Sequence, residues 1–354
     1  MDRRTLLKAG LATTAGGLLV PAADGLVEGA EAAPRVQRTL AKNLAVPWGI
    51  AFLPNGDALV GERDTGAVFR VSRRGGRRRV GTIPIGAMHA AGGEGGVLGL
   101  ALSPRFRRDR WVYAYVSTSS DNRIVRMRYR DGRLGPRRVV LAGIPMAGHH
   151  NGGRLAFHGG LLYASTGDAG NSSLSQDRGS LAGKILRMTP DGRVPQGNPF
   201  GNYTWSWGHR NVEGIAWDSR GRLWASEFGQ DTWDELNRIV RGGNYGWPRS
   251  EGGDGRGGNR DPFARWSPAD CSPSGVAVAG DWAFLGALRG QALWAVKVTG
   301  PGRGRRRRFF HERFGRIRTA QKAPDGSLWI TTSNHDGRSD SPHRNDDRVI
   351  RLRL

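Results

Sequence analysis

One pattern recurs six times along the chain, and it limits the possible folds more than any other feature of the sequence. Each copy is a short segment that carries an alanine, then a turn usually built on glycine with asparagine, aspartate or serine, then a second segment rich in aromatic and β-branched residues. Two examples are GIAFLPNGDALVGER from Gly49 and GIAWDSRGRLWASEFG from Gly214. The aligned alanines are spaced 50, 55, 60, 61 and 43 residues apart, at Ala51, Ala101, Ala156, Ala216, Ala277 and Ala320. A repeat of this length is typical of one blade of a β-propeller.

The segments that follow each hairpin complete this interpretation. A third strand-like segment follows every copy, such as AVFRVSR after the first and DRVIRLRL at the end of the chain. The sixth copy therefore lacks a fourth strand, which the segment RVQRTLAKNL from Arg35 can supply. Closing the ring in this way protects the strand edges that an open array would expose. We predict an all-β fold, a six-bladed β-propeller over residues 33–354, closed by an N-terminal strand that completes the last blade.

Residues 1–32 predict an export signal of the twin-arginine type. The segment DRRTLLKAGLATTAGGLLV has paired arginines and a lysine before an apolar run that is too short to span a bilayer comfortably. The small residues of AEA at 30–32 suit a signal peptidase, so we expect the mature chain to begin near Ala33. An amphipathic anchor helix fits less well because the charges lie at one end. The mature protein is therefore expected to be periplasmic or extracellular, with no transmembrane segment.

Charge and cysteine content restrict the partners of the chain. The formal net charge is +23, and residues 1–32 carry three positive and four negative side chains, so their removal gives +24. Nucleic-acid binding is one interpretation of such a charge. The densest runs, RRGGRRR from Arg73 and GRGRRRR from Gly302, lack the interleaved aromatic residues that stack on bases. We expect no specific nucleic acid as a partner. The single cysteine, Cys271, excludes an internal disulfide.

The order of strands in a blade predicts where functional residues collect. Loops that enter first strands and loops that leave second strands open on one face of the ring, whereas tight turns such as PDG at Pro324 lie on the other. The residues that enter first strands include Glu94, His149, His150, His209, Arg210, Asn211, Arg316 and, beginning its strand, Arg318. The residues that leave second strands include Asp168, the run from Glu227, Arg289 and Asn334. All of them are expected to converge around the central channel.

Four of these residues predict an anionic ligand. They are the arginines Arg210, Arg289, Arg316 and Arg318. Guanidinium groups repel one another and do not deprotonate in proteins, so four of them stay close only with anions between them. One arginine alone could turn outward into water, but for all four this is the weaker interpretation. A polycarboxylate or a phosphate is implied.

The segment AGHHNGGRL, which contains His149 and His150, leaves three roles open for its histidines: metal ligand, packed structural side chain, or base. Adjacent residues of an extended chain point to opposite sides, so we expect only one of the two to face the channel. A zinc site would need further ligands with suitable geometry. A histidine beside several arginines is a credible base, because its ordinary pKa lies near the operating pH.

The segment EFGQDTWDELNRIVRGGNYGWP from Glu227 is rich in the oxygen donors that Ca²⁺ prefers. It offers three carboxylates, backbone carbonyls next to glycines, and a tyrosine, at Asp231, Asp234, Glu235 and Tyr245. The spacing is not that of an EF-hand. A surface loop with an Asx turn is an equally good interpretation of these residues taken alone.

Several motifs together resemble one known family. HHNGGRLAF, WGHRNVEGIAWD, SEFGQDTWDELNRIVRGGNYGWP and GRIRTA are similar to segments of the soluble quinoprotein sugar dehydrogenases, in particular the aldose sugar dehydrogenase branch of the glucose/sorbosone dehydrogenase family. The similarity runs from about Val46 to the carboxyl end. It implies a six-bladed propeller that binds pyrroloquinoline quinone (PQQ), a tricarboxylate, together with Ca²⁺. It also implies an aldose substrate and an electron acceptor that the sequence does not identify.

The resemblance implies roles for individual residues. His150 would be the base that takes the proton of the anomeric hydroxyl while C1 passes a hydride to the quinone, and Arg210 would polarise the accepting carbonyl. The cofactor-binding residues would be Glu94, His150, Arg210, Asn211, Arg289, Arg316 and Arg318. Backbone carbonyls of Gly229 and Gln230 would hold the PQQ-bound Ca²⁺, and Glu235 and Tyr245 would be ligands of a second, structural Ca²⁺. Glu94 and Arg289 stand where the glucose enzyme has glutamine and lysine.

Two other functions remain as alternatives. A Ca²⁺-dependent lactonase of the same architecture would need several carboxylates around a metal at the channel centre, whereas arginines dominate this face. A propeller that has lost catalysis and binds a glycan or a protein would have no use for His150, Arg210 and Asn211 together. We therefore favour a PQQ-dependent oxidoreductase that oxidises aldoses at C1 to lactones.

Overall fold

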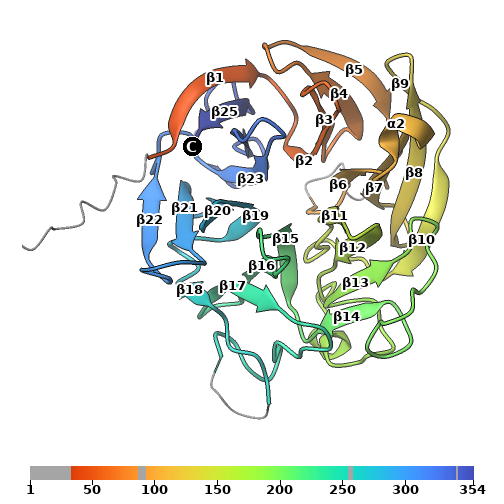
Figure 1. The fold of residues 1–354 in the computed structure, drawn as a ribbon, viewed down its shortest axis with the longest axis vertical. Helices are drawn as coiled ribbons and strands as arrows, with labels where there is room; N and C mark the ends of the chain where they lie inside the picture. Colours follow the sequence, from red (N-terminus) through yellow and green to blue (C-terminus); the bar gives the residue numbers. More distant parts are fainter. Residues whose placement is uncertain (1–32, 87–92, 254–257, 340–341) are drawn as a thin grey trace, which may run out of the picture. The chain divides into compact units, whose positions relative to one another are not determined.

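The computed structural model of the chain describes residues 33–86, 93–253, 258–339 and 342–354. Within residues 33–354, six antiparallel sheets surround a central channel as the blades of a β-propeller (Figure 1). This arrangement confirms the predicted all-β fold and the number of blades. The predicted export signal, residues 1–32, lies outside the described residues. The helices of the described part are too short or too polar to cross a membrane.

Five blades are built from consecutive strands, with the first strand of each nearest the channel (Figure 1). The first blade contains β2 (Pro47–Phe52), β3 (Ala58–Glu62), β4 (Ala67–Val71) and β5 (Arg77–Thr82). The second contains β6 (Val97–Leu102), β7 (Trp111–Ser117), β8 (Asn122–Arg130), the short β9 (Arg133–Leu134) and β10 (Arg138–Ile144). The third contains β11 (Leu155–His158), β12 (Leu161–Ser165), β13 (Lys184–Met188) and β14 (Thr204–Trp207). The fourth contains β15 (Asn211–Trp217), β16 (Leu223–Phe228), β17 (Asp234–Ile239) and β18 (Ala264–Trp266). The fifth contains β19 (Pro273–Ala279), β20 (Trp282–Ala287), β21 (Ala292–Lys297) and β22 (Arg306–Phe309).

The sixth blade joins the two ends of the propeller. It contains β23 (Ile317–Lys322), β24 (Leu328–Thr332), β25 (Val349–Arg353) and, as its outermost strand, β1 (Arg35–Ala41). Strand β1 runs antiparallel to β25, with Thr39 opposite Ile350. The predicted closure by an N-terminal strand is therefore confirmed.

The repeated alanines mark the innermost strands. Each of the six lies in the first strand of its blade, and a large residue often stands opposite on the second strand, as in the pairs Ala101–Tyr113 and Ala216–Trp224. Two residues before the alanine, four blades have glycine. A Cβ at Gly99 would overlap the carbonyl oxygen of Gly153 in the next blade. Glycine here lets the innermost strands of neighbouring blades approach to backbone contact.

Arginine takes the place of this glycine in the third and sixth blades, at Arg154 and Arg318. Both side chains are buried. The Arg154 guanidinium lies 3.9 Å from the centre of the Trp48 ring, and its Nε donates to the carbonyl of Glu213 at 3.0 Å. The two arginines occupy space that the four glycines leave in the middle of the ring.

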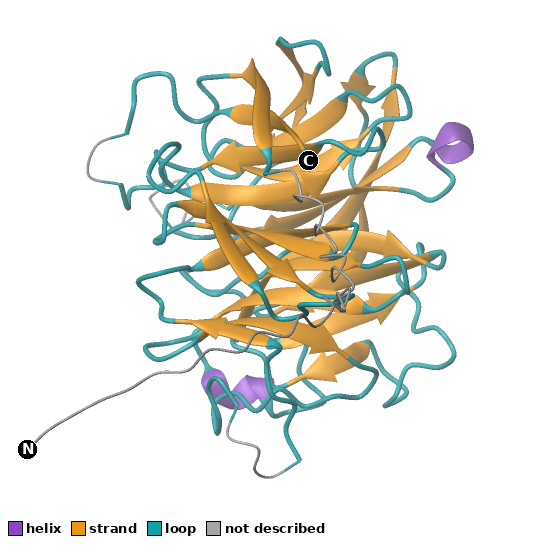
Figure 2. Cartoon of the chain, turned by 60° about the vertical axis from the view of Figure 1, so that its left-hand side comes forward, coloured by secondary structure: helices purple, strands orange, loops and turns teal. Residues whose placement is uncertain are grey.

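Loops gather on the two faces of the propeller (Figure 2). The helix α2 (Phe106–Asp109) lies in the connection between β6 and β7, on the face of the tight hairpins. The 3₁₀ helix η1 (Ser172–Ser175) follows β12, on the face predicted to carry the functional residues.

Candidate active site

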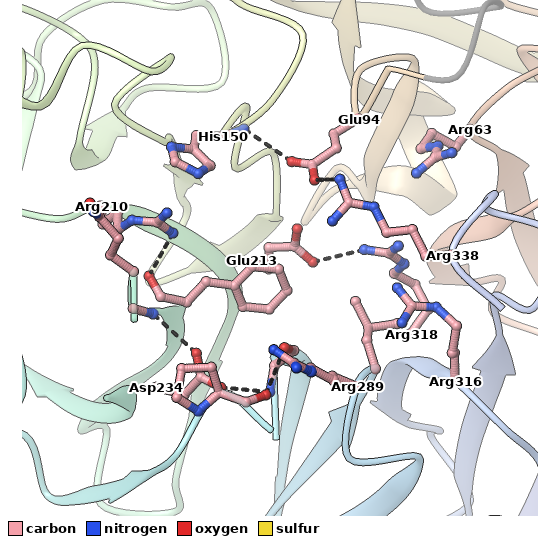
Figure 3. Close-up of a pocket in the computed structure, with 16 residues that line it drawn as sticks. Arg63, Glu94, His150, Arg210, Glu213, Asp234, Arg289, Arg316, Arg318 and Arg338 are labelled. Atoms are coloured by element: carbon pink, nitrogen blue, oxygen red, sulfur yellow. Dashed lines mark hydrogen bonds and ion pairs between the residues drawn. The ribbon is translucent and has the colours of Figure 1, made fainter. Parts of the chain in front are cut away.

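A cavity of about 360 Å³ opens at one mouth of the channel (Figure 3). The loops around it enter first strands or leave second strands, as the strand order predicted. Charged side chains dominate its lining, with six arginines and three carboxylates: Arg63, Arg210, Arg289, Arg316, Arg318, Arg338, Glu94, Glu213 and Asp234. In the view of Figure 3, His150 and Arg210 lie on one side of the cavity and Arg316, Arg318 and Arg338 on the other.

Most of the sequence-predicted site residues meet at this cavity. Those that line it are Glu94, His150, Arg210, Gly229, Gln230, Arg289, Arg316 and Arg318. Asn211 lies directly behind the lining, where its Oδ1 accepts a hydrogen bond from the backbone N–H of Gly152 at 2.9 Å. Glu235 and Tyr245 are outside the lining.

His150 is held in a fixed orientation. Its Nδ1 lies 2.7 Å from Oδ1 of Asp168, and its backbone N–H donates to Oε2 of Glu94 at 3.1 Å. Burial alone would raise the pKa of Asp168, but hydrogen bonds from His150, the Gly170 N–H and the Trp247 indole outweigh it and hold that pKa below its usual value. An ionised Asp168 keeps a proton on Nδ1, which leaves the lone pair on Nε2 of His150.

His149 does not point away from His150 as expected. The backbone of His150 has a φ of 55°, so the pair is not extended, and the two rings pack edge to face with centroids 4.4 Å apart. Both rings line an outer depression next to the cavity, but only His150 also lines the cavity itself. The expectation that only one histidine faces the channel therefore holds for the inner cavity, for a different geometric reason.

Arg210 and Asn211 present donors that the protein does not use. The Nε of Arg210 and the Nδ2 of Asn211 are buried and have no hydrogen-bond partner among the described residues. Burial lowers the pKa of Arg210, although Asp168 and other nearby carboxylates oppose this shift. The Arg210 guanidinium also lies 5.4 Å from the centre of the Trp247 ring. Unused buried donors are costly, so they indicate a ligand with acceptor groups.

Arg316 and Arg318 share one carboxylate. Oδ2 of Asp336 accepts from Arg316 at 2.9 Å and from Arg318 at 3.1 Å. Arg318 also pairs with Glu213 at 3.0 Å. Burial lowers the pKa of Arg316 despite Asp336, whereas Glu213 and Asp336 together overcome burial and raise the pKa of Arg318. Arg316 is the less compensated cation of the two, so an anion in the cavity would stabilise it.

The outer rim of the cavity carries two more cations. Arg289 is exposed and makes no hydrogen bond or ion pair with the described part of the chain. Arg338, with 61% of its side chain exposed, pairs with Oε1 of Glu94. Glu94 therefore bridges the loop that leaves β24 and the backbone of His150.

The loop after β16 offers carbonyl oxygens to the cavity. Gly229 and Gln230 line it, and in the described structure no N–H or O–H group donates to the carbonyl of either residue. Asp234 lies beside them and accepts from the N–H groups of Gly229 at 3.1 Å and Ser272 at 2.6 Å. Burial raises the pKa of Asp234 to about 6 in spite of these bonds. Backbone carbonyls near a carboxylate are suitable donors for a hard cation.

Glu235 belongs to a second polar cluster behind the cavity. It accepts from the N–H of Gly252 at 2.7 Å and from Nδ2 of Asn237 at 2.8 Å. Burial and the nearby charge of Glu227 raise the pKa of Glu235, and the Oδ1 of Asn237 has no partner in the described chain. A cation would satisfy both groups. The Tyr245 hydroxyl donates to the carbonyl of Arg238 at 2.6 Å and accepts from the N–H of Val240 at 3.0 Å, so it is already engaged within the protein.

Sequence reasoning missed four charged residues of this site. Arg63, Glu213 and Arg338 line the cavity, and Asp336 pairs with its arginines. Arg63 leaves the second strand of the first blade, and Asp336 and Arg338 leave that of the sixth. Arg289 was predicted because it leaves the second strand of its blade. The same criterion, applied to every blade, would have found these three residues.

The chain is similar in sequence and in fold to known sugar dehydrogenases. The sequence matches the family described as Glucose / Sorbosone dehydrogenase over residues 44–341. The fold is similar to that of the PQQ-bound aldose sugar dehydrogenase of Streptomyces coelicolor, with a TM-score of 0.86 and 48% identity over 90% of this chain and 97% of that one.

Two further proteins are more distant relatives. The aldose sugar dehydrogenase YliI of Escherichia coli is 29% identical over 82% of this chain and 88% of its own length. The quinoprotein glucose dehydrogenase B of Acinetobacter calcoaceticus is 30% identical over 69% of this chain and 59% of its own length.

Proposed function

The chain belongs to the glucose/sorbosone dehydrogenase family, and from this premise we propose that it is a PQQ-dependent oxidoreductase that oxidises aldose sugars at C1 to lactones. One observation carries the proposal. A histidine paired with a buried aspartate, His150 with Asp168, stands at a cavity that six arginines line. The PQQ-bound relative supports the choice of cofactor.

The residues of the cavity fit a flat tricarboxylate. The unused donors of Arg210 and Asn211 would hydrogen-bond the oxygens at one edge of PQQ. Two arginines would pair with PQQ carboxylates. Arg289 has no partner in the described chain, and Arg316 shares its one carboxylate partner, Asp336, with Arg318. Arg318 and Glu94 would complete the set of cofactor contacts.

Other residues at and behind the cavity could bind calcium. The carbonyls of Gly229 and Gln230 would hold the ion that accompanies PQQ, because they line the cavity and accept no hydrogen bond from the described residues. A second, structural Ca²⁺ would be bound near Glu235 and Tyr245. The unsatisfied Oδ1 of Asn237 and the two carboxylates beside it support this second site.

His150 and its neighbours supply the proton chemistry. When bound, PQQ is the acceptor for the hydride that leaves C1 of the sugar. Asp168 holds the proton on Nδ1 of His150, so Nε2 can take the proton of the anomeric hydroxyl. The sugar then loses one proton and one hydride, its C1–O bond becomes a carbonyl, and the product is a lactone. With PQQ bound, the guanidinium of Arg210 would supply a fixed positive charge that stabilises negative charge on an oxygen of the acceptor.

Reconstitution of the apoprotein tests the proposal. PQQ and Ca²⁺ are added, and reduction of a dye is followed with glucose, galactose, xylose and maltose. His150→Ala is expected to keep PQQ binding and to lose most turnover. The matched control is His158→Ala, at the far end of β11 from the cavity, which should behave as wild type. Normal turnover per bound PQQ in His150→Ala would contradict the role of His150 as base.

The same assay separates the alternatives. A Ca²⁺-dependent lactonase would hydrolyse a lactone without PQQ, and a glycan- or protein-binding propeller would do neither. The excess of arginines over carboxylates in the cavity favours the oxidoreductase over the lactonase.

We also propose that the protein is exported by the twin-arginine route and acts in the periplasm or outside the cell. The paired arginines of residues 1–32 support this location. Replacement of both Arg3 and Arg4 by lysine should keep the protein in the cytoplasm. The N-terminal residue of the exported protein should lie near Ala33.

A further inference from the structure

A single carboxylate organises the turn that follows β16. Oε1 of Glu251 accepts hydrogen bonds from the backbone N–H groups of Gln230, Thr232 and Trp233, at 2.8, 3.0 and 2.9 Å. Glu251 comes from the segment between β17 and β18, some twenty residues further along the chain. Three N–H groups on one oxygen form an arrangement that an anionic acceptor stabilises far better than a neutral one.

The hydrogen bond from Gln230 sets the direction of the Gly229 carbonyl. The peptide unit is planar and trans, so the carbonyl of residue 229 points opposite to the N–H of residue 230. Because that N–H points at Glu251, the Gly229 carbonyl points away from Glu251. Gly229 lines the cavity, and none of the described donors reaches its oxygen. The oxygen therefore belongs to a residue at the cavity, points away from Glu251 and is free to bind a ligand.

The fit between Glu251 and Gly229 is close. A Cβ added at residue 229 would run into the carboxylate oxygen of Glu251 and overlap the carbonyl oxygen of Trp233. The φ of Gly229 is not in the left-handed region, so glycine is required here by space and not by backbone conformation. The carboxylate lies directly against the backbone that it orients.

The neighbouring peptide is fixed in a similar way. The N–H of Gly229 donates to Asp234 at 3.1 Å, and the carbonyl of Phe228, in the same peptide unit, accepts from Arg210 at 3.5 Å. The peptide before the Gly229 carbonyl is thus held by Asp234 and Arg210, and the peptide that contains it is held by Glu251. Removal of Glu251 would release only the second of these.

We propose that Glu251 is a positioning residue for calcium: it holds the Gly229 carbonyl toward the cavity and adds a negative charge behind the ion. This inference rests on the proposed function, which places a PQQ-bound Ca²⁺ at the carbonyls of Gly229 and Gln230. Groups behind the direct ligands of a metal commonly change its affinity by about 10–100-fold when they are removed. A change of that size is expected for Glu251→Ala.

The test measures Ca²⁺ binding and not only turnover. Wild type, Glu251→Ala and Glu251→Gln are titrated with Ca²⁺ in the presence and absence of PQQ, by calorimetry and by the absorbance of bound PQQ. The PQQ-dependent Ca²⁺ affinity should fall by about 10–100-fold in Glu251→Ala. It should fall less in Glu251→Gln, which keeps an acceptor oxygen but loses the charge. The thermal midpoint of each apoprotein, measured without Ca²⁺, shows whether the variant is folded.

Two further variants define the cause. Gly229→Ala keeps Glu251 in the chain, but the new Cβ would collide with the carboxylate oxygen of Glu251 and with the carbonyl oxygen of Trp233. This variant should therefore also weaken Ca²⁺ binding. Asp325→Asn is the matched control, because Asp325 also accepts a backbone N–H in a turn, that of Ser327 at 3.0 Å, on the opposite face of the propeller. Its Ca²⁺ and PQQ affinities should equal those of wild type.

Each outcome decides the inference. Wild-type Ca²⁺ affinity in the folded Glu251 variants, with or without a lower thermal midpoint, would overturn it and leave the proposed function intact. If Glu251→Ala does not fold, Glu251→Gln decides the matter by the same criterion. A wild-type protein that binds neither PQQ nor Ca²⁺ would overturn the proposed function and this inference together.

Discussion

The Nδ1 atom of His150 lies 2.7 Å from the carboxylate of Asp168, and the other oxygen of that carboxylate accepts the indole N–H of Trp247 at 2.9 Å. Asp168 is almost completely buried, with 2% of its surface exposed. Both of its oxygens must therefore accept a hydrogen bond, which a carboxylate can do and an amide of the same size cannot. The orientation and the protonation of His150 depend on this one side chain.

Asp168→Asn should lose turnover without losing the cofactor. An asparagine has one acceptor oxygen, so either Trp247 or His150 would face its NH₂ group. When the NH₂ group faces His150, the ring proton moves to Nε2 and the base is lost. We expect turnover to fall on the order of 10²-fold or more, the usual contribution of a general base. The measurements are dye reduction under saturating sugar and titration with PQQ, whose affinity should change by less than about threefold. A variant with wild-type turnover would show that the proton on Nδ1 is fixed by another group.

Arg289→Ala should weaken PQQ binding and leave the apoprotein as stable as wild type. Arg289 makes no hydrogen bond or ion pair with the described residues, so its removal costs the apoprotein little. A charge-assisted bond to a PQQ carboxylate contributes about 1.5–3 kcal/mol, which corresponds to a complex that is weaker by about 10- to 150-fold. PQQ titration and urea unfolding of the apoprotein measure the two quantities.

Arg316→Ala and Arg289→Lys provide the contrast. Arg316 shares the buried carboxylate of Asp336, so its removal should destabilise the apoprotein by about 1–3 kcal/mol as well as weaken PQQ binding. Arg289→Lys keeps the charge and should retain most of the affinity. Equal PQQ affinity in Arg289→Ala and wild type would remove Arg289 from the cofactor site.

The sequence predicted the fold because its repeat reflects a local packing requirement. Glycine two residues before alanine recurs in four of the six blades, and at Gly49 and Gly99 it lets the innermost strands of neighbouring blades touch. A requirement that repeats from blade to blade leaves a periodic signal. The two exceptions, Arg154 and Arg318, are the residues that fill the channel.

The site was less predictable because some of its pairs cross between blades. Arg318 meets Glu213 although 105 positions separate them in sequence, and Arg338 meets Glu94 across 244. No local pattern reports such a contact. The position of each residue within its own blade was predictable, whereas the partner it would meet was not. Glu251 was hidden for another reason, since it lies in the long connection between β17 and β18, which has no counterpart in the repeat.

Gly99→Ala should destabilise the propeller. The new Cβ would overlap the carbonyl oxygen of Gly153, and backbone atoms cannot move aside as a side chain does. Overpacking of this kind costs about 1–3 kcal/mol. Gly135→Ala is the control, because its Cβ would meet only the carbonyl oxygen of Arg128, at 3.5 Å, and its φ is not left-handed. Urea unfolding should show a change within about 0.5 kcal/mol for the control. Equal stabilities would mean that the innermost strands can separate at little cost.

Asp218 should make the propeller sensitive to acid. In the β15–β16 hairpin its Oδ2 accepts from the indole N–H of Trp224 at 2.9 Å and from Nε of Arg222 at 2.7 Å, and its Oδ1 accepts two backbone N–H groups. Burial would raise the pKa of Asp218, but these hydrogen bonds outweigh burial and lower it. The unfolded chain therefore binds the proton more readily than the folded chain does. The contribution of Asp218 to stability is complete above the ordinary aspartate pKa of about 4 and is lost as the pH falls through the lower pKa of the folded state.

Asp218→Asn tests this sign. At pH 7 the variant should be less stable than wild type by about 1–3 kcal/mol, because the amide NH₂ group cannot accept from Trp224 and Arg222. The difference in the free energy of unfolding between the two proteins should shrink as the pH is lowered from about 5 to about 3, since only wild type has a proton to gain at this position. Urea unfolding at several pH values measures the difference, and the other acidic groups cancel because both proteins share them. A difference that stays constant or grows over this range would mean that the folded state does not favour the ionised form of Asp218.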